Sequence, residues 1–318
     1  MRALVIGGNG FIGSHLAEGL RAGGHGVRVL DPGPARTDTD WSGIVYRQGA
    51  YTDPATLAAA LDDVDTVFHL ASTTVPATSN RDPVHDVSTN LIGALGLIDA
   101  LEAAGIRRIV FFSSGGTVYG NPERLPVPEE HPLRPISSYG IVKVAIEQYL
   151  RMHGHLGRLD PLILRPSNPY GPRQSAAGGQ GFIAAALARA RTGEGLQIWG
   201  DGETVRDYLY IDDLVRLAID AAASDVCGTF NAGSGEGRSL NAVRDAVVRV
   251  TGRPLPTDYQ PARGFDVREV VLDTPAARTR FGWTPRVDLD DGIARTWRWH
   301  AGAERPDSPF PQTQGLPR

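Results

Sequence analysis

The 318-residue sequence is poor in cysteine and has no long hydrophobic run. Cys227 is its only cysteine, so an intrachain disulfide is excluded and a reducing compartment is favoured. We expect Cys227 to be a small buried apolar residue rather than a catalytic thiol. The apolar run at residues 3–6 is too short for a signal peptide or a membrane span, and no later run is long enough. These features predict a cytoplasmic protein.

The sequence also lacks an excess of charge of either sign. Its formal net charge is −4, and its lysines and arginines form no cluster, so we expect neither nucleic acid nor a membrane surface as a partner. His153 and His155 resemble a metal-binding pair, but no cysteine or carboxylate stands near them in the sequence. We therefore expect no metal site.

Glycine, in contrast, is abundant and is concentrated near the N-terminus. Gly7, Gly10 and Gly13 stand between an apolar strand at residues 2–6 and a predicted helix that follows. In this context glycines form a tight turn, let backbone N–H groups approach a pyrophosphate and bring the helix close to the strand. The helix N-terminus then faces the phosphates. The stretch predicts a dinucleotide site.

An acidic residue ends the next predicted strand. Asp31 follows residues 27–30 at a spacing typical of the carboxylate that binds an adenosine ribose diol. A carboxylate there repels a 2′-phosphate, which favours NAD over NADP. Arg36 nearby leaves NADP as the less favoured option.

Strands and helices alternate through the first half of the chain. This pattern predicts an α/β fold, a Rossmann-type doubly wound parallel sheet whose ligand lies beyond the carboxyl ends of the strands. After residue 170 the alternation becomes irregular, which predicts a smaller mixed α/β lobe. We expect a Rossmann domain at residues 1–169, to which later segments can return, a substrate lobe at 170–302 and a disordered tail at 303–318.

A tyrosine and a lysine lie four residues apart in a predicted helix. Tyr139 and Lys143 share one face of that helix, so the ammonium of Lys143 is expected to lower the pKa of the Tyr139 phenol. A phenolate near neutral pH is a general base for a sugar or steroid hydroxyl. The pair alone is a weak signal and gains its meaning from the nucleotide site predicted around it.

Together these motifs resemble the extended short-chain dehydrogenase/reductase family, in its nucleotide-sugar epimerase and dehydratase branch. The resemblance covers residues 2–300 and includes several ordered motifs. They are GGNGFIG (7–13), Asp31, VFHLA (67–71), Asn90, SSGGTVYG (113–120), YGIVK (139–143), LRPSNPYGPRQ (164–174), RDY (206–208) and FGWTP (281–285).

The resemblance implies a role for each motif. Tyr139 is the expected acid/base, and Lys143 holds the nicotinamide ribose and tunes Tyr139. The expected cofactor-binding residues are Gly7, Gly10, Phe11, Ile12, Gly13, Asp31, Tyr51, Leu70, Ala71, Asn90, Ser113, Tyr139 and Lys143. The expected substrate contacts are Asn168, Arg206 and Arg263 at the diphosphate and Asp266 at the nucleoside ribose.

Two positions depart from the family pattern. Ala50 replaces an aspartate that bonds adenine, so adenine recognition must rely on packing or backbone groups. Gly115 stands where many relatives carry a catalytic Ser or Thr, so Ser114 or Thr117 must supply that hydroxyl, and we favour Thr117.

The expected reaction is 4-epimerisation of a nucleotide sugar, most simply a UDP-hexose, through a 4-keto sugar. A 4,6-dehydratase is the first alternative, but relatives place an Asp-Glu pair where this chain has Gly116 and Thr117. A decarboxylase, a 4-ketoreductase, a net sugar dehydrogenase and a non-catalytic NAD sensor stay open. Relatives also predict a homodimer through the helices near residues 86–104 and Tyr139.

Overall fold

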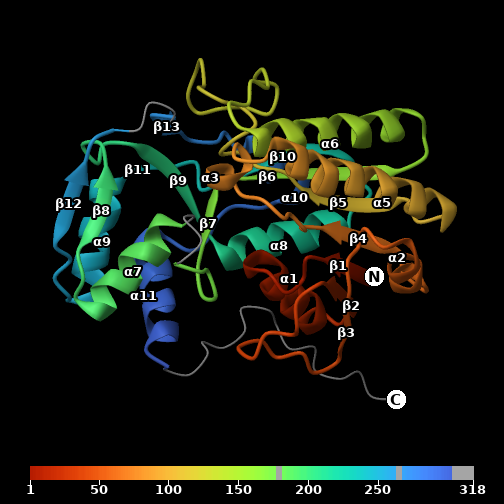
Figure 1. Ribbon diagram of the computed structural model, residues 1–318, viewed down its shortest axis with the longest axis horizontal. Helices are drawn as coiled ribbons and strands as arrows, with labels where there is room; N and C mark the ends of the chain where they lie inside the picture. Colours follow the sequence, from red (N-terminus) through yellow and green to blue (C-terminus); the bar gives the residue numbers. More distant parts are fainter. Residues whose placement is uncertain (177–180, 263–266, 303–318) are drawn as a thin grey trace.

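The fold is taken from a computed structural model, which describes residues 1–176, 181–262 and 267–302. Arg263, Asp266 and the tail at 303–318 lie outside the described residues. Figure 1 shows a large sheet with helices on both faces and a smaller group of strands and helices beside it.

The large sheet has seven strands, all parallel, in the order β10-β6-β5-β4-β1-β2-β3. The order reverses between β1 and β4, which is the switch point where doubly wound sheets bind their ligands. The strands are β1 (Arg2–Ile6), β2 (Gly26–Asp31), β3 (Ile44–Gln48), β4 (Thr66–His69), β5 (Arg108–Phe112), β6 (Asp160–Pro166) and β10 (Gly228–Ala232). The predicted fold class is confirmed.

Alternate side chains of the strands fill two separate cores. Ala3 and Val5 of β1 pack with α1 (Phe11–Ala22) and α8 (Ile211–Ala222) on one face. Leu4 and Ile6 pack with α2 (Pro54–Leu61), α5 (Ile92–Ala103) and α6 (Ser138–His155) on the other. Because both faces are covered, the strands read as continuous apolar runs rather than as alternating ones.

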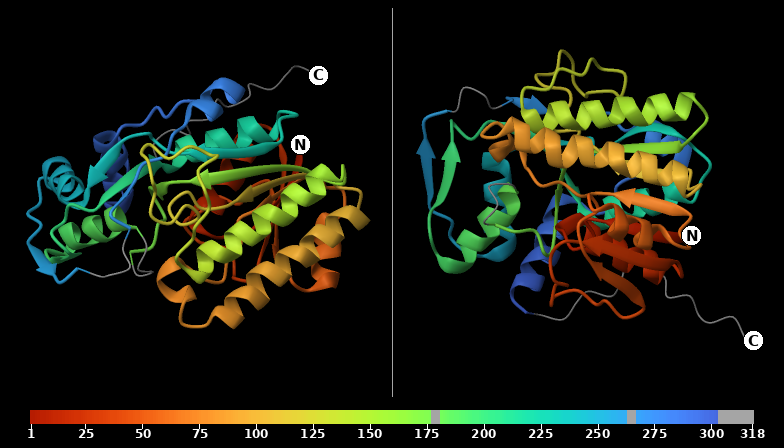
Figure 2. Two further views of the ribbon diagram at one scale, coloured as in Figure 1. Left: turned by 90° about the horizontal axis from the view of Figure 1, so that it is seen from above. Right: turned by 45° about the vertical axis from the view of Figure 1, so that its right-hand side comes forward.

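The helical segment at residues 83–103 is interrupted rather than uniform. It begins as α4 (Pro83–Asp86), passes through a π-helical turn at Val87–Leu91, labelled η1, and continues as α5. A short helix, α3 (Pro76–Ser79), precedes it. Figures 1 and 2 show α5 and α6 side by side along one face of the sheet. The π turn places Asn90 beside the carboxyl end of β4, where a side chain can reach the switch point.

The smaller lobe combines short strands with three helices. In its sheets β9 pairs with β7, β11 and β13, and β8 pairs with β12. The strands are β7 (Asn168–Tyr170), β8 (Leu196–Trp199), β9 (Val205–Tyr210), β11 (Gly237–Ser239), β12 (Thr257–Gln260) and β13 (Glu269–Val270). The helices are α7 (Phe182–Thr192), α9 (Leu240–Thr251) and α11 (Leu289–His300), while α10 (Pro275–Phe281) packs against β10 and α8.

Residues 230–232 form part of β10, which lies in the large sheet beside β6. One local expectation is wrong. Cys227 is exposed, because it lies in the turn just before β10 begins. No helix among the described residues has the length and apolar character needed to cross a membrane.

Candidate active site

The glycine loop and the end of β4 meet at the switch point. A Cβ on Gly7, whose φ is +83°, would lie 2.7 Å from the Ala71 backbone nitrogen, and one on Gly13 would overlap the Gly7 carbonyl oxygen. Side chains at these two positions are therefore excluded by backbone atoms. Phe11 and Ile12 open α1 directly beside this crossing. The loop has the bare backbone that a dinucleotide pyrophosphate requires.

Asp31 lies at the carboxyl end of β2 with its oxygens held by backbone donors. It accepts hydrogen bonds from the Asn9 N–H (3.1 Å) and the Gly33 N–H (3.0 Å). Arg36 forms two 2.8 Å hydrogen bonds with Asp38, so its guanidinium is already engaged by a carboxylate. This arrangement suits a ribose diol better than a 2′-phosphate.

The structure gives Tyr51, Asn90 and Ser113 internal partners. Tyr51 is buried, and its hydroxyl donates to the Thr89 carbonyl at 3.0 Å. Asn90 binds Thr73 and Asp86, and Ser113 donates to Glu147 at 2.5 Å. The side chains of all three residues therefore support the walls of the site, and Leu70 and Ala71 line its floor with backbone after β4.

Tyr139 and Lys143 lie in the first turns of α6, as the sequence predicts. Ser137 caps this helix by accepting from the Gly140 N–H. The Lys143 ammonium is buried, donates to the Phe112 carbonyl at 2.9 Å and lies 5.5 Å from the centre of the Tyr139 ring. The pair therefore faces the carboxyl end of β5 at the ligand-binding edge of the sheet.

The expected pKa of Tyr139 is wrong for the protein without ligand. Burial, together with the negative charge of Asp86, raises the pKa of Tyr139 to about 12. Burial lowers the pKa of Lys143 to about 8, although Asp86 and Glu147 act in the opposite direction. The phenol thus keeps its proton at neutral pH until a ligand changes its surroundings.

The departure at Gly115 has a steric cause. A Cβ there would lie 2.5 Å from the Leu272 Cδ1 and 2.9 Å from the Arg165 carbonyl oxygen, so no serine fits at this position. Thr117 is nearby, since its carbonyl oxygen would lie 3.0 Å from a Cβ on Gly140. The Thr117 hydroxyl is buried and has no hydrogen-bond partner among the described residues. A buried hydroxyl without a partner in the loop next to α6 is a candidate for a ligand hydrogen bond.

Below the site, a buried ion pair joins three elements. Arg165 of β6 donates to both oxygens of Glu147 in α6, at 2.9 and 2.6 Å, and to the Tyr119 hydroxyl at 2.8 Å. Glu147 and Asp86 are the polar residues near the site that we missed in the sequence. The sequence could have revealed both, because a spacing of four residues puts side chains on the same face of a helix. Glu147 follows Lys143 by four residues, and Asp86 precedes Asn90 by four.

The small lobe brings Asn168 and Arg206 together. They lie on the paired strands β7 and β9, and Asn168 donates to the Asp207 carbonyl at 3.1 Å. The Arg206 guanidinium donates to the Arg268 carbonyl at 3.4 Å, and Arg268 lines a groove of about 400 Å³ together with Trp199 and Ala262. Arg263 and Asp266 themselves lie outside the described residues.

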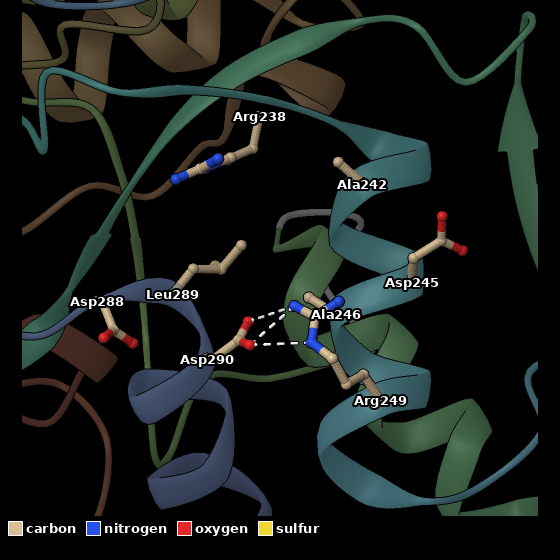
Figure 3. Close-up of a pocket in the computed structure, with 8 residues that line it drawn as sticks. All are labelled: Arg238, Ala242, Asp245, Ala246, Arg249, Asp288, Leu289 and Asp290. Atoms are coloured by element: carbon tan, nitrogen blue, oxygen red, sulfur yellow. Dashed lines mark hydrogen bonds and ion pairs between the residues drawn. The ribbon is translucent and has the colours of Figure 1, made fainter.

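A larger groove of about 540 Å³ lies between α9 and α11, away from α6 (Figure 3). Arg249 and Asp290 span it with a paired ion contact at 2.7 Å. It contains none of the predicted site residues, so we do not assign it to the catalytic centre.

Histidine makes no metal site among the described residues, where no group of three or more candidate ligand side chains is found. His153 does have a carboxylate partner, Glu102 of α5, which the sequence did not reveal. Because these residues are far apart in sequence, only the packing of α5 against α6 brings them together.

Comparison with known proteins gives one consistent result. Residues 3–233 match the NAD dependent epimerase/dehydratase family. A UDP-glucose 4-epimerase of Mycolicibacterium smegmatis is 37% identical over 305 residues, which cover 93% of this chain and 97% of the relative.

Solved structures agree with this match. A UDP-glucose 4-epimerase of Thermotoga maritima with UDP-glucose superposes with a TM-score of 0.90 at 35% identity, covering 95% of this chain and 99% of the other. A UDP-glucose 4-epimerase of Thermus thermophilus in complex with NAD gives 0.89 at 34% identity, covering 96% and 100%. With its glycine loop, Asp31 and Tyr139–Lys143 pair at the switch point of the sheet, this chain belongs to the NAD-dependent epimerase/dehydratase family.

Proposed function

We propose that the protein is an NAD-dependent UDP-sugar 4-epimerase. The observation that carries the proposal is the position of Tyr139 and the buried Lys143 at the ligand-binding edge of a dinucleotide-binding sheet. The loop after β5 adds the Thr117 hydroxyl, which has no hydrogen-bond partner among the described residues. The similarity to 4-epimerases over nearly the whole chain supports the same reaction.

The residues present fit NAD as the resident cofactor. Gly7, Gly10 and Gly13, with Phe11 and Ile12 at the start of α1, would hold the pyrophosphate, and Asp31 would bind the adenosine ribose diol. Leu70 and Ala71 would pack against the cofactor, while Tyr51, Asn90 and Ser113 would shape its walls from behind. When bound, NAD supplies a hydride acceptor and a positively charged ring.

Tyr139 moves the proton in this proposal. The Tyr139 oxygen takes the proton of the sugar 4-hydroxyl during oxidation and returns it during reduction, so the reaction has no net redox change. Lys143 holds the nicotinamide ribose and favours the phenolate by its charge. Thr117 donates to the same sugar oxygen and keeps it in line with Tyr139, with Ser114 as the weaker candidate for that role.

The small lobe would bind the nucleotide diphosphate. Arg206 and Asn168, on neighbouring strands, would reach the diphosphate. Arg263, which lies outside the described residues, is the third proposed diphosphate contact. Asp266 would contact the nucleoside ribose. We thus propose that residues 1–169 with the returning β10 bind NAD and that residues 170–302 bind the UDP-sugar.

We further propose a cytoplasmic homodimer. The single cysteine fits a reducing compartment. An unusual number of large apolar side chains is exposed along α4, α5 and α6, which favours a second copy of this chain as their partner. They are Val84, Ile92, Ile141, Tyr149, Met152 and Leu156.

The direct test removes the phenol hydroxyl. We expect Tyr139→Phe to lose at least about 99% of the UDP-glucose/UDP-galactose interconversion, because no other group takes the 4-hydroxyl proton. Tyr149→Phe, on an exposed position of the same helix, is the matched control and should keep wild-type activity. Near-normal epimerisation by Tyr139→Phe would overturn the proposed mechanism.

A further inference from the structure

Asp86 is a fully buried carboxylate beside the catalytic pair that the proposed reaction does not use. It ends α4, where the π turn begins. Its oxygens accept hydrogen bonds from the hydroxyl of Thr74 (2.7 Å), the amide of Asn90 (2.8 Å) and the hydroxyl of Ser138 (2.7 Å). Each donor comes from a different segment of the chain, so Asp86 joins the loop after β4, the π turn and the first residue of α6.

Asn90 extends this junction toward the sheet. Its side-chain oxygen accepts from the Thr73 N–H at 2.9 Å, and its amide also donates to the Thr73 hydroxyl at 3.0 Å. With these contacts, both Thr73 and Thr74 are tied to the Asp86–Asn90 turn. A buried carboxylate is tolerated only when donors surround it, so loss of any one donor also weakens the hold on the others.

The same loop reaches the catalytic helix a second way. The Ser138 N–H donates to Asn80 at 2.8 Å, and the Tyr139 N–H donates to the Ser79 hydroxyl at 3.1 Å. These are N–H groups of the first turn of α6, which have no partner within their own helix. Residues 73–80 are therefore joined to the turn that carries Tyr139 by Asp86 from one side and by Ser79 and Asn80 from the other.

We propose that Asp86 is a positioning residue for the epimerase. It fixes the first turn of α6 against residues 73–80 and places a buried carboxylate beside Tyr139 and Lys143. The inference rests on the proposed function for the role of Tyr139, and on the hydrogen bonds alone for the junction.

The charge of Asp86 acts on both members of the pair. It raises the pKa of Tyr139 and raises the pKa of Lys143, and the other titratable groups that face the pair are Glu147 on α6 and His69 on β4. Removal of the Asp86 charge should lower both values. The phenolate then forms at lower pH, and the Lys143 ammonium is also lost at lower pH. Both limbs of the pH–activity profile should therefore move in the acid direction.

The main experiment is a titration of Tyr139 in NAD-loaded protein. The phenolate absorbance is measured against pH for Asp86→Asn with and without Tyr139→Phe, so that the difference reports Tyr139 alone. The same difference is measured for the protein with Asp86 in place. Relative to the wild-type protein treated in the same way, we expect a downward shift of the Tyr139 titration on the order of one pH unit. Asp99→Asn, an exposed acidic position on α5, should leave the titration unchanged. An unshifted Tyr139 in Asp86→Asn, or an equal shift in Asp99→Asn, would overturn the charge effect.

A second pair of variants tests the junction while the charge stays. Thr74→Val and Ser138→Ala each remove one donor to Asp86. We expect kcat to fall about tenfold, because Tyr139 is displaced. Both limbs of the pH–activity profile should stay at their wild-type pH, because the charge of Asp86 is kept. If Asp86→Asn does not fold, the Thr74→Val and Ser138→Ala variants still test whether Asp86 positions Tyr139. A kcat within about twofold of wild type in both variants would contradict a positioning role.

The two proposals can fail separately. The titration needs no turnover, so a shifted Tyr139 in a protein that epimerises no UDP-sugar supports the role of Asp86 and rejects the proposed function. If the protein epimerises UDP-sugars normally, but the Tyr139 titration is unshifted and the Thr74 and Ser138 variants keep their kcat, the proposed function is supported and the role of Asp86 is rejected.

Discussion

At the scale of single residues, the lack of a side chain at Gly115 gives the Thr117 hydroxyl its proposed role. Leu272 and the end of β6 occupy the space that a side chain at Gly115 would need. The hydroxyl must then come from elsewhere in the same loop, and the Thr117 hydroxyl is buried without a partner among the described residues. The sequence indicated the missing hydroxyl, but only the packing explains why it cannot be restored in place.

We expect Thr117→Ala to lower kcat by about 10- to 100-fold, the effect of losing one hydrogen bond to a reacting oxygen. Thr117→Ser, which keeps the hydroxyl, should stay within a few-fold of wild type. Ser114→Ala is the matched comparison and should cost less than Thr117→Ala. The assignment is wrong if Ser114→Ala causes the larger loss, or if Gly115→Ser restores the activity of Thr117→Ala.

His69 carries a second prediction, on stability. It is buried between the rings of Tyr51 and Phe111, and burial, with a smaller contribution from Lys143, lowers its pKa to about 3. Below about pH 6.5, His69 is protonated in the unfolded chain but stays neutral in the folded protein. The contribution of neutral His69 to the free energy of unfolding is fully present above about pH 6.5. It falls by about 1.4 kcal/mol per pH unit as the pH is lowered from about 6.5 to about 3.

We expect His69→Phe to remove this contribution, because the ring can still pack but binds no proton. Between about pH 7 and pH 5 the variant should lose roughly 2 kcal/mol less than wild type, seen as a smaller drop in the thermal midpoint. The exposed His85, changed to Gln, provides the control. Identical acid sensitivity of wild type and His69→Phe would show that His69 is not the cause.

At the scale of elements, most of the architecture was predictable from periodicity and caps. Asp53, Ser239 and the Thr274–Pro275 pair mark the starts of α2, α9 and α10. β3 was not predicted; it is a short edge strand in which Val45, Arg47 and Gln48 are exposed. The π turn at Val87–Leu91 was also not predictable, since its cause is the set of contacts that Asp86 and Asn90 make with distant segments.

The exposed apolar side chains of α5 and α6 give a prediction for assembly. On α6 they are three to eight residues apart and lie on one stripe, and Ile92 extends the surface onto α5. We expect wild type to have the mass of two chains by light scattering, and the double variant Ile92→Arg/Ile141→Arg to have the mass of one. Buried arginines without partners would oppose the association.

Val248→Arg, at an exposed apolar position on α9, should leave the dimer intact. A wild-type protein with the mass of one chain, or a double variant that remains dimeric, would rule out this surface as the interface.

At the scale of the molecule, the strand ends of the large sheet were easier to place from the sequence than the elements of the small lobe. Strand ends meet at one edge of a parallel sheet whatever the details, so Gly7, Asp31, Ala71 and Tyr139 could be placed together in advance. The small lobe follows no such rule. Its strands are two to six residues long and include both parallel and antiparallel pairs. β10 returns to the large sheet, where it packs against β6 and α10.

The central claim is that the enzyme oxidises and reduces the same sugar carbon in one turnover. The most direct measurement follows NADH absorbance and product together while the NAD-loaded protein is incubated with UDP-glucose, UDP-N-acetylglucosamine or UDP-glucuronate. The account predicts that at least one of these sugars is converted to its 4-epimer, and back, with no net change in NADH. NADH accumulating in step with product, or bound NAD with no epimer from any UDP-sugar, would contradict it.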